Sequence, residues 1–146
     1  IDRIARINPD LAYFDHFYAL QYADFVLRDK FPEGEPAIAT NAKSSYWYAY
    51  SVLHGPFLLG EKAIAKDVEN SYSYARLLKE RFKLGEPTIA TNAQYSYLYA
   101  NHVIHDAFIL GESEIAKNEH YAELYTQYVL KKDFYLDGKL ICKYEG

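Results

Sequence analysis

Two histidines three residues apart are the nearest approach to a metal site in the sequence. His102 and His105 could face the same side of one helix, because residues three apart are neighbours on a helix surface. A metal ion would need a further ligand, and only Asp106 is close in the sequence. His54 holds the equivalent place two repeats earlier, too far away to contribute. We therefore expect solvated histidines at helix ends, where the helix dipole favours their charged form, and no bound metal or cofactor.

The remaining reactive side chains lack partners for catalysis. Cys142 is the only cysteine, and it has no neighbouring base that would activate it, so we expect a buried, inert thiol. Glu119 and Glu123 are four residues apart, which is typical of carboxylates that solvate an exposed helix face. No phosphate-binding loop, dinucleotide-binding glycine motif, calcium loop or zinc-ligand spacing is present. The sequence therefore favours a protein that is not an enzyme.

Tyrosine is the unusual residue type of this chain. The 146 residues include 16 Tyr and 8 Phe, against one Trp and no Met. Tyr and Trp are the residue types that binding hot spots favour, so aromatic residues without an evident packing role are candidates for recognition. The candidate binding residues are Tyr46, Trp47, Tyr50, Tyr95, Tyr121 and Tyr128.

Charge and hydropathy exclude two kinds of partner. The formal charge is −4 and the bases are dispersed among acids, whereas binding to nucleic-acid phosphates requires clustered Lys and Arg. No apolar run approaches the roughly 18 residues that a membrane-spanning helix needs. We therefore expect a soluble protein with no nucleic-acid or membrane partner. A single cysteine cannot form an internal disulfide, which favours a reducing, cytoplasmic location.

An aromatic anchor recurs along the chain at a nearly constant spacing. Phe31, Phe57, Phe82, Phe108 and Phe134 are 26, 25, 26 and 26 residues apart, and Gly-Glu and Ile-Ala follow the first four at fixed distances. A period of this length is typical of solenoids that stack one helical or strand unit on the next. The sequence thus predicts a single all-α domain, an α-solenoid of tandem helix-turn-helix repeats. Its expected parts are a longer N-terminal unit 1–30, repeats 31–56, 57–81, 82–107 and 108–133, and a partial unit 134–146.

Each repeat is expected to form a short helix followed by a longer one. Asn41, Asp67, Asn92 and Asn118 precede the longer helices, and Asn and Asp are favoured N-cap residues. Prolines near the start of two repeats fit only the first turn of a helix. The expected short helices begin near residues 32–34, 58, 84 and 109, and the expected longer helices span about 42–54, 68–79, 93–105 and 119–131.

The two ends of the chain depart from this pattern. Asn8 and Pro9 resemble an N-cap and a first helical residue, so the sequence predicts a helix from Pro9 to Leu27 or Arg28, about two turns longer than its counterparts. At the other end, the repeat favours a short helix over 135–143. The alternative there is a β-hairpin with Asp137-Gly138 as its turn.

The longer helices share a pattern of small residues and tyrosine. Counted from the cap residue, position 4 is small, position 7 is Tyr and position 8 is small or Thr, with Val or Leu at position 11. Positions 4, 8, 11 and 12 lie on one stripe of a helix, which we expect to be the stacking face. Small residues there would let helix backbones approach closely. Positions 9 and 10 vary between repeats, which indicates an outward face.

The repeat resembles the short tandem helical repeats of bacteriophage-encoded proteins, with openings like Trp-Pro-Glu-Ala-Glu-Pro and Tyr-Ala-rich second helices. The matching segments are 31–36, FPEGEP, and 97–100, YLYA, although Phe replaces the usual Trp throughout and the Asp-Pro cap appears only as Asn8-Pro9. The architecture is also similar to tetratricopeptide and Sel1-like hairpins, whose repeats are longer. The resemblance implies an α-solenoid of viral origin, hence a host-cytoplasmic protein, and it assigns no chemistry.

Three functions are compatible with these observations. The favoured one is a non-enzymatic helical-repeat scaffold that binds another protein through a Tyr-rich surface. The second is a structural or virion-associated protein that self-associates through its repeats. The third is a repeat protein that sequesters a small molecule between its layers.

Overall fold

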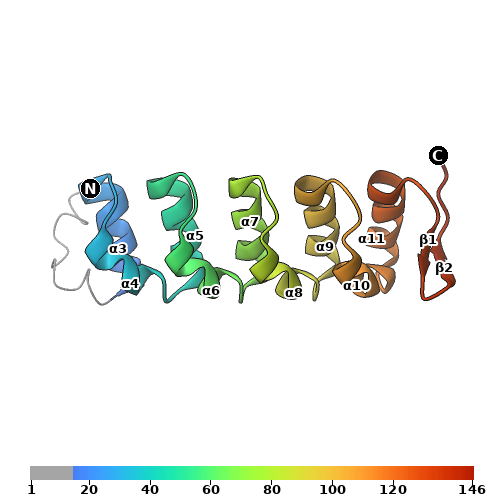
Figure 1. The fold of residues 1–146 in the computed structure, drawn as a ribbon, viewed down its shortest axis with the longest axis horizontal. Helices are drawn as coiled ribbons and strands as arrows, with labels where there is room; N and C mark the ends of the chain where they lie inside the picture. Colours follow the sequence, from blue (N-terminus) through green and yellow to red (C-terminus); the bar gives the residue numbers. More distant parts are fainter. Residues whose placement is uncertain (1–14) are drawn as a thin grey trace.

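The computed structural model describes residues 15–146 and shows a mostly helical chain with one small two-stranded sheet at its C-terminal end. The longer helices lie side by side in chain order, and the short helices follow one another along one edge of the row (Figure 1). This confirms the all-α prediction in its main outline. Among the described residues, no helix combines the length and the apolar character needed to cross a membrane.

Segment 31–56 shows how the local sequence produces two helices. A 3₁₀ turn, Pro32–Gly34, leads into the short helix α4, Glu35–Ile38. The chain then extends at Asn41, whose side chain accepts a hydrogen bond of 2.9 Å from the Ser44 amide. This cap satisfies one of the free amides in the first turn of α5, Ala42–Tyr48.

The following segments have the same order of elements. Short helices α6 (Glu61–Ile64), α8 (Glu86–Ile89) and α10 (Glu112–Ala116) each follow a 3₁₀ turn (Leu58–Gly60, Lys83–Gly85 and Ile109–Gly111). The longer helices are α3 (His16–Gln21), α7 (Val68–Leu78), α9 (Ala93–Tyr99) and α11 (Glu119–Leu124). Asp67, Asn92 and Asn118 cap α7, α9 and α11 as predicted.

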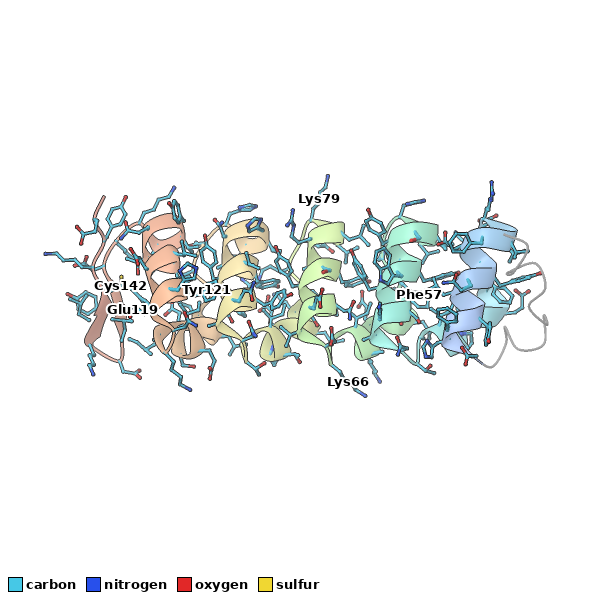
Figure 2. All side chains as sticks on the ribbon, turned by 180° about the vertical axis from the view of Figure 1, so that it is seen from behind. Phe57, Lys66, Lys79, Glu119, Tyr121 and Cys142 are labelled. Carbon is cyan, nitrogen blue, oxygen red and sulfur yellow. The ribbon has the colours of Figure 1, made fainter. Side chains whose placement is uncertain are left out.

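Side chains fill the spaces between neighbouring longer helices (Figure 2). Small residues bring the backbones together, as shown by the contact between Ser96 in α9 and Gly111, which precedes α10. A Cβ atom placed on Gly111 would lie only 2.5 Å from the Ser96 hydroxyl oxygen. Each segment also contributes buried side chains to one continuous core: Ile38, Ile64, Ile89 and Ile115 from the short helices, and Ala23, Ala49, Ala75 and Ala100 from position 8.

The longer helices of the 26-residue segments finish in a wider, π-helical turn. After α5 the chain continues as Ala49–Leu53, and the His54 amide bonds to the carbonyl five residues back, of Ala49. In the 25-residue segment, α7 stays α-helical, and the Lys79 amide bonds four residues back, to Ala75. The π turn thus accommodates the one residue that a 26-residue segment has in addition to the 25-residue segment. The side chains before and after the turn keep the same packing positions in both. The other π-helical turns are Tyr22–Leu27, Ala100–Ile104 and Tyr125–Leu130.

The prediction of a long N-terminal helix is wrong in its described part. Asp15 has an extended backbone (φ −120°, ψ 124°), and its carboxylate accepts hydrogen bonds from the Phe17 and Tyr18 amides. It therefore caps α3, as Asn41 caps α5 twenty-six residues later. A helix cannot run through a residue in this conformation. The predicted start at Pro9 lies outside the described residues.

The preference for a C-terminal helix is also wrong. Strands β1, Phe134–Leu136, and β2, Lys139–Cys142, form an antiparallel hairpin. Asp137 and Gly138 connect them, and both have positive φ angles (52° and 78°). A two-residue turn with two positive φ values matches the right-handed twist of the strands, and Asp-Gly is one of its favoured sequences. Local turn chemistry therefore outweighs the repeat here.

Candidate binding surface

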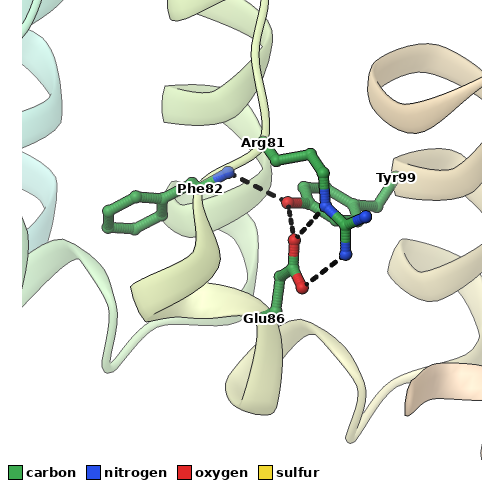
Figure 3. Close-up of polar contacts among 4 residues, drawn as sticks. All are labelled: Arg81, Phe82, Glu86 and Tyr99. Atoms are coloured by element: carbon green, nitrogen blue, oxygen red, sulfur yellow. Dashed lines mark hydrogen bonds and ion pairs between the residues drawn. The ribbon is translucent and has the colours of Figure 1, made fainter. Parts of the chain in front are cut away.

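A hydrogen-bonded chain of three residues connects the two helices within a segment. The Phe82 amide donates to the Tyr99 hydroxyl oxygen over 2.9 Å, and that hydroxyl donates to Glu86 Oε2 over 2.6 Å (Figure 3). Arg81 completes the group with two hydrogen bonds to the same carboxylate, of 2.8 and 2.9 Å. Donors thus surround a largely buried carboxylate, which is why it can remain charged there.

The electrostatics of this group follow from burial and from these bonds. Burial raises the pKa of Glu86, but the hydrogen bonds and charge of Arg81, together with the Tyr99 hydroxyl, outweigh it and leave that pKa below its usual value. Burial, followed by the hydrogen bond to Glu86, holds the pKa of Tyr99 far above its usual range. The phenol therefore stays protonated and acts as a structural donor.

The same bonds recur in the other three segments. Tyr48 bonds Phe31 and Glu35, Tyr74 bonds Phe57 and Glu61, and Tyr125 bonds Phe108 and Glu112, with hydroxyl–carboxylate distances of 2.6–2.7 Å. All four tyrosines are fully buried. The structural role expected for position 7 is therefore confirmed. The glutamate partner was missed, although its fixed place after each glycine was a visible signal.

Three of the candidate binding residues form one aromatic cluster. Tyr46, Trp47 and Tyr50 have ring centroids 5.4–6.0 Å apart, and they come from α5 and the π turn that follows it. Trp47 is 41% exposed and Tyr50 is 50% exposed, whereas Tyr46 is half-buried. The structure thus brings these three together as an accessible patch, which we call the Trp47 cluster.

Tyr95 and Tyr121 belong to a different arrangement. Tyr95, at position 3 of its helix, packs on Tyr72, at position 5 of the preceding one, with ring centroids 5.5 Å apart. Tyr121 packs on Tyr97 in the same way, at 6.1 Å. Burial is the main cause that raises the pKa of Tyr95. These two residues therefore fill grooves between helices and offer less surface for recognition than expected.

Polar side chains at position 9 bond to these paired rings. Arg76 donates to the Tyr72 hydroxyl over 3.2 Å, with its guanidinium carbon 5.9 Å from the ring centroid. Asn101 donates to the Tyr97 hydroxyl over 3.4 Å. Arg is also a hot-spot residue type, and nothing in the sequence pattern distinguished Arg76 from an ordinary surface charge.

Tyr128 is the most exposed of the six candidates, at 61%. It lies on the π turn after α11, so the segments of α7 and α9 separate it from the Trp47 cluster. The structure therefore does not place all six candidate residues in one patch. It places an exposed cluster on α5, the second longer helix, two filled grooves between α7, α9 and α11, and a single exposed ring on the π turn after α11.

The other titratable and nucleophilic side chains that the sequence singled out are not grouped with one another in the described part of the chain. Burial first, then the charges of Arg76 and His105, lower the pKa of His102. Within residues 15–146, no three His, Cys, Asp or Glu side chains are grouped closely enough to hold a metal ion. Cys142 is half-buried in β2, and not in the helical position predicted for it. Glu119 and Glu123 line a shallow depression beside it.

Comparison of the chain with protein-family models, with curated proteins and with solved structures finds no match.

Proposed function

We propose that this chain is an α-solenoid scaffold, without enzymatic activity, that binds another protein through the aromatic side of its longer helices. Recurrent bonds and buried residues support the stacked architecture. The hydrogen bonds between Tyr and Glu join the two helices of each segment. The same tyrosine ring packs on the phenylalanine of the next segment, as Tyr99 does on Phe108 with ring centroids 5.0 Å apart. A stack of this kind forms a rigid, extended surface, which suits recognition.

The observation that supports protein binding best is the exposure of the Trp47 cluster. Large aromatic rings that contact one another usually pack inward in a soluble protein, and exposed apolar clusters mark interaction sites. Tyr and Trp contribute a large contact area at a small entropic penalty, and their polar edges tolerate water before a partner arrives. The cluster therefore fits the centre of an interface with a protein surface.

The test is a binding measurement with a matched control. A partner captured from a cell lysate is purified. Its affinity is measured for the wild type, for Trp47→Ala/Tyr50→Ala and for Leu58→Ala/Ile109→Ala, which truncates exposed residues on the 3₁₀ turns. We expect the first variant to weaken binding by at least about 30-fold and the second by little, because hot-spot aromatics contribute 2 kcal/mol or more. Unchanged affinity in Trp47→Ala/Tyr50→Ala would refute this surface.

A second candidate function, self-assembly, is favoured by a different surface. Exposed apolar residues recur on the 3₁₀ turns of successive segments, with Leu58 75% and Ile109 73% exposed, and Leu59, Leu84 and Leu110 beside them. A second copy of the chain would present the same residues at the same spacing. Sedimentation over a wide concentration range tests this. Association that disappears in Leu58→Ser/Ile109→Ser would support it, and a monomer at all concentrations would exclude it.

A further inference from the structure

A groove opens between the first two longer helices of the described chain. It lies between α3 and α5, which are neighbours at the N-terminal end of the row (Figure 1), and has a volume of about 620 Å³. Phe17 and Phe25 form one side, Trp47 the other, and buried Leu20 part of the floor. The three aromatic rings are all exposed. A concave opening of this size with apolar walls is typical of ligand sites.

This groove lacks the two tyrosines that fill two other grooves of the row. In the α7–α9 and α9–α11 grooves, a tyrosine at position 5 of one helix packs on a tyrosine at position 3 of the next. In the α3–α5 groove the corresponding residues are Leu20 and Ser44, both of which line the opening. The hydroxyl of Ser44 and His16 Nδ1 are hydrogen-bonded over 2.7 Å, and both residues line the groove.

We propose that this groove receives a tyrosine side chain from a segment of the partner protein. The inference rests on the proposed function and names the anchor that the partner supplies. It is based on how the chain itself fills the corresponding space, since two of the three other grooves, α7–α9 and α9–α11, each hold a pair of phenol rings, and the third, α5–α7, has Tyr46 and Asn70 at these positions. An incoming ring would pack between Trp47 and Phe17 in the offset or edge-to-face geometries that aromatic pairs favour.

The polar lining selects tyrosine over phenylalanine. In both filled grooves the side chain at position 9 bonds to the hydroxyl of the position-5 tyrosine, through Arg76 and Asn101. The residue at position 9 in the first groove is Asp24, which lines the opening and presents a carboxylate. A carboxylate can only accept, so it matches a phenol hydroxyl that donates, and it disfavours a purely apolar ring because its hydration would be lost without compensation.

Trp47 provides a direct measurement of occupancy, because it is the only tryptophan in the chain. The full chain is titrated with N-acetyl-tyrosine amide while Trp47 emission is excited beyond tyrosine absorption, and N-acetyl-phenylalanine amide and N-acetyl-leucine amide serve as comparison probes. We expect saturable binding that is strongest for the tyrosine probe and weakest for the leucine probe. In Asp24→Leu the preference for tyrosine over phenylalanine should disappear.

The decisive variant is Leu20→Tyr/Ser44→Tyr, which restores the missing pair. Its melting temperature should be equal to or above that of the wild type, because the rings fill an existing opening, while binding of the tyrosine probe falls at least about tenfold. Equal binding by this folded variant, or a leucine probe that binds as tightly as tyrosine, would overturn the inference. If the purified partner still binds this variant but not Trp47→Ala/Tyr50→Ala, the proposed function stands and the groove is not its anchor site.

Discussion

Tyr99 donates a hydrogen bond to Glu86 over 2.6 Å, and the two residues lie thirteen positions apart on the two helices of one segment. The same hydroxyl accepts from the Phe82 amide, and the ring packs edge-on against Phe108 of the next segment. One side chain thus joins its own segment by its hydroxyl and the following segment by its ring. Phenylalanine would keep the second contact only, which explains why this position is tyrosine in the four segments between residues 31 and 133.

Removal of this hydroxyl should therefore destabilise the fold. In Tyr125→Phe the Phe108 amide and the Glu112 carboxylate would both lose a buried partner. We expect the free energy of unfolding to fall by about 1–3 kcal/mol. Denaturant unfolding measures it, with Tyr128→Phe as the exposed control, for which the change should stay within about 0.5 kcal/mol. Equal effects of the two substitutions would contradict the bonded role.

The close approach of Gly111 to Ser96 predicts a steric penalty for any side chain there. The added Cβ of Gly111→Ala would lie 2.5 Å from Ser96 Oγ and 2.8 Å from the Phe108 ring. We expect a loss of about 1–3 kcal/mol, the usual range for overpacking. Gly55→Ala is the control, since its Cβ would meet nothing closer than 3.9 Å. Thermal melts of the two variants should differ clearly, and a Gly111→Ala protein as stable as Gly55→Ala would refute the contact.

The π turns predict which single-residue deletions the chain tolerates. Deletion of His102, within Ala100–Ile104, would give this segment the residue spacing of the α-helical segment that contains α7. The variant should fold, with little loss of stability. Deletion of Ser73 from α7 would instead rotate every later residue by about 100°, which moves Tyr74 out of the core. Circular dichroism melts of both deletions test this, and a collapse of the first would contradict the π-turn account.

The lowered pKa of Glu86 predicts that the free energy of unfolding depends on pH in the acidic range. Its pKa is lower in the folded state than in the unfolded chain, so its contribution to stability is present above the unfolded pKa of about 4.3 and is lost as the pH falls through the folded pKa. Arg81→Gln removes the main cause of that lowering. Because Arg81 is 46% exposed, we expect a loss below about 1 kcal/mol at pH 7 that vanishes at low pH. A constant difference across that range would argue against this ion pair.

The sequence predicted the repeating part of the fold because several local signals agreed there. The caps at Asn41 and Asn92, the proline positions and the Tyr pattern all indicated the same two helices, and the structure has them. The predictions are wrong at the two ends of the described chain, where the helical pattern of the repeats was assumed to continue. At Asp15 a good cap residue was mistaken for helix interior, and at Asp137-Gly138 a strong turn was given less weight than the period.

The binding surface was predicted less well, and for a physical reason. Sequence identifies aromatic residues but not which of their neighbours fill the groove beside them. The sequence does not show that Tyr95 is packed and Tyr50 exposed, because the ring of Tyr95 packs on Tyr72 of another segment. The groove between α3 and α5 was invisible for the same reason, since it arises from Leu20 and Ser44, two residues of ordinary type.

Hydroxyl-radical footprinting of the complex with the captured partner tests the central proposal most directly, because it reads both exposed surfaces in one experiment. Oxidation rates of Trp47, Tyr50, Leu58 and Ile109 are compared in the free and bound chain. Protection of Trp47 and Tyr50, with the rates at Leu58 and Ile109 unchanged, is the predicted result. Protection confined to Leu58 and Ile109 would contradict recognition through the aromatic side of the longer helices.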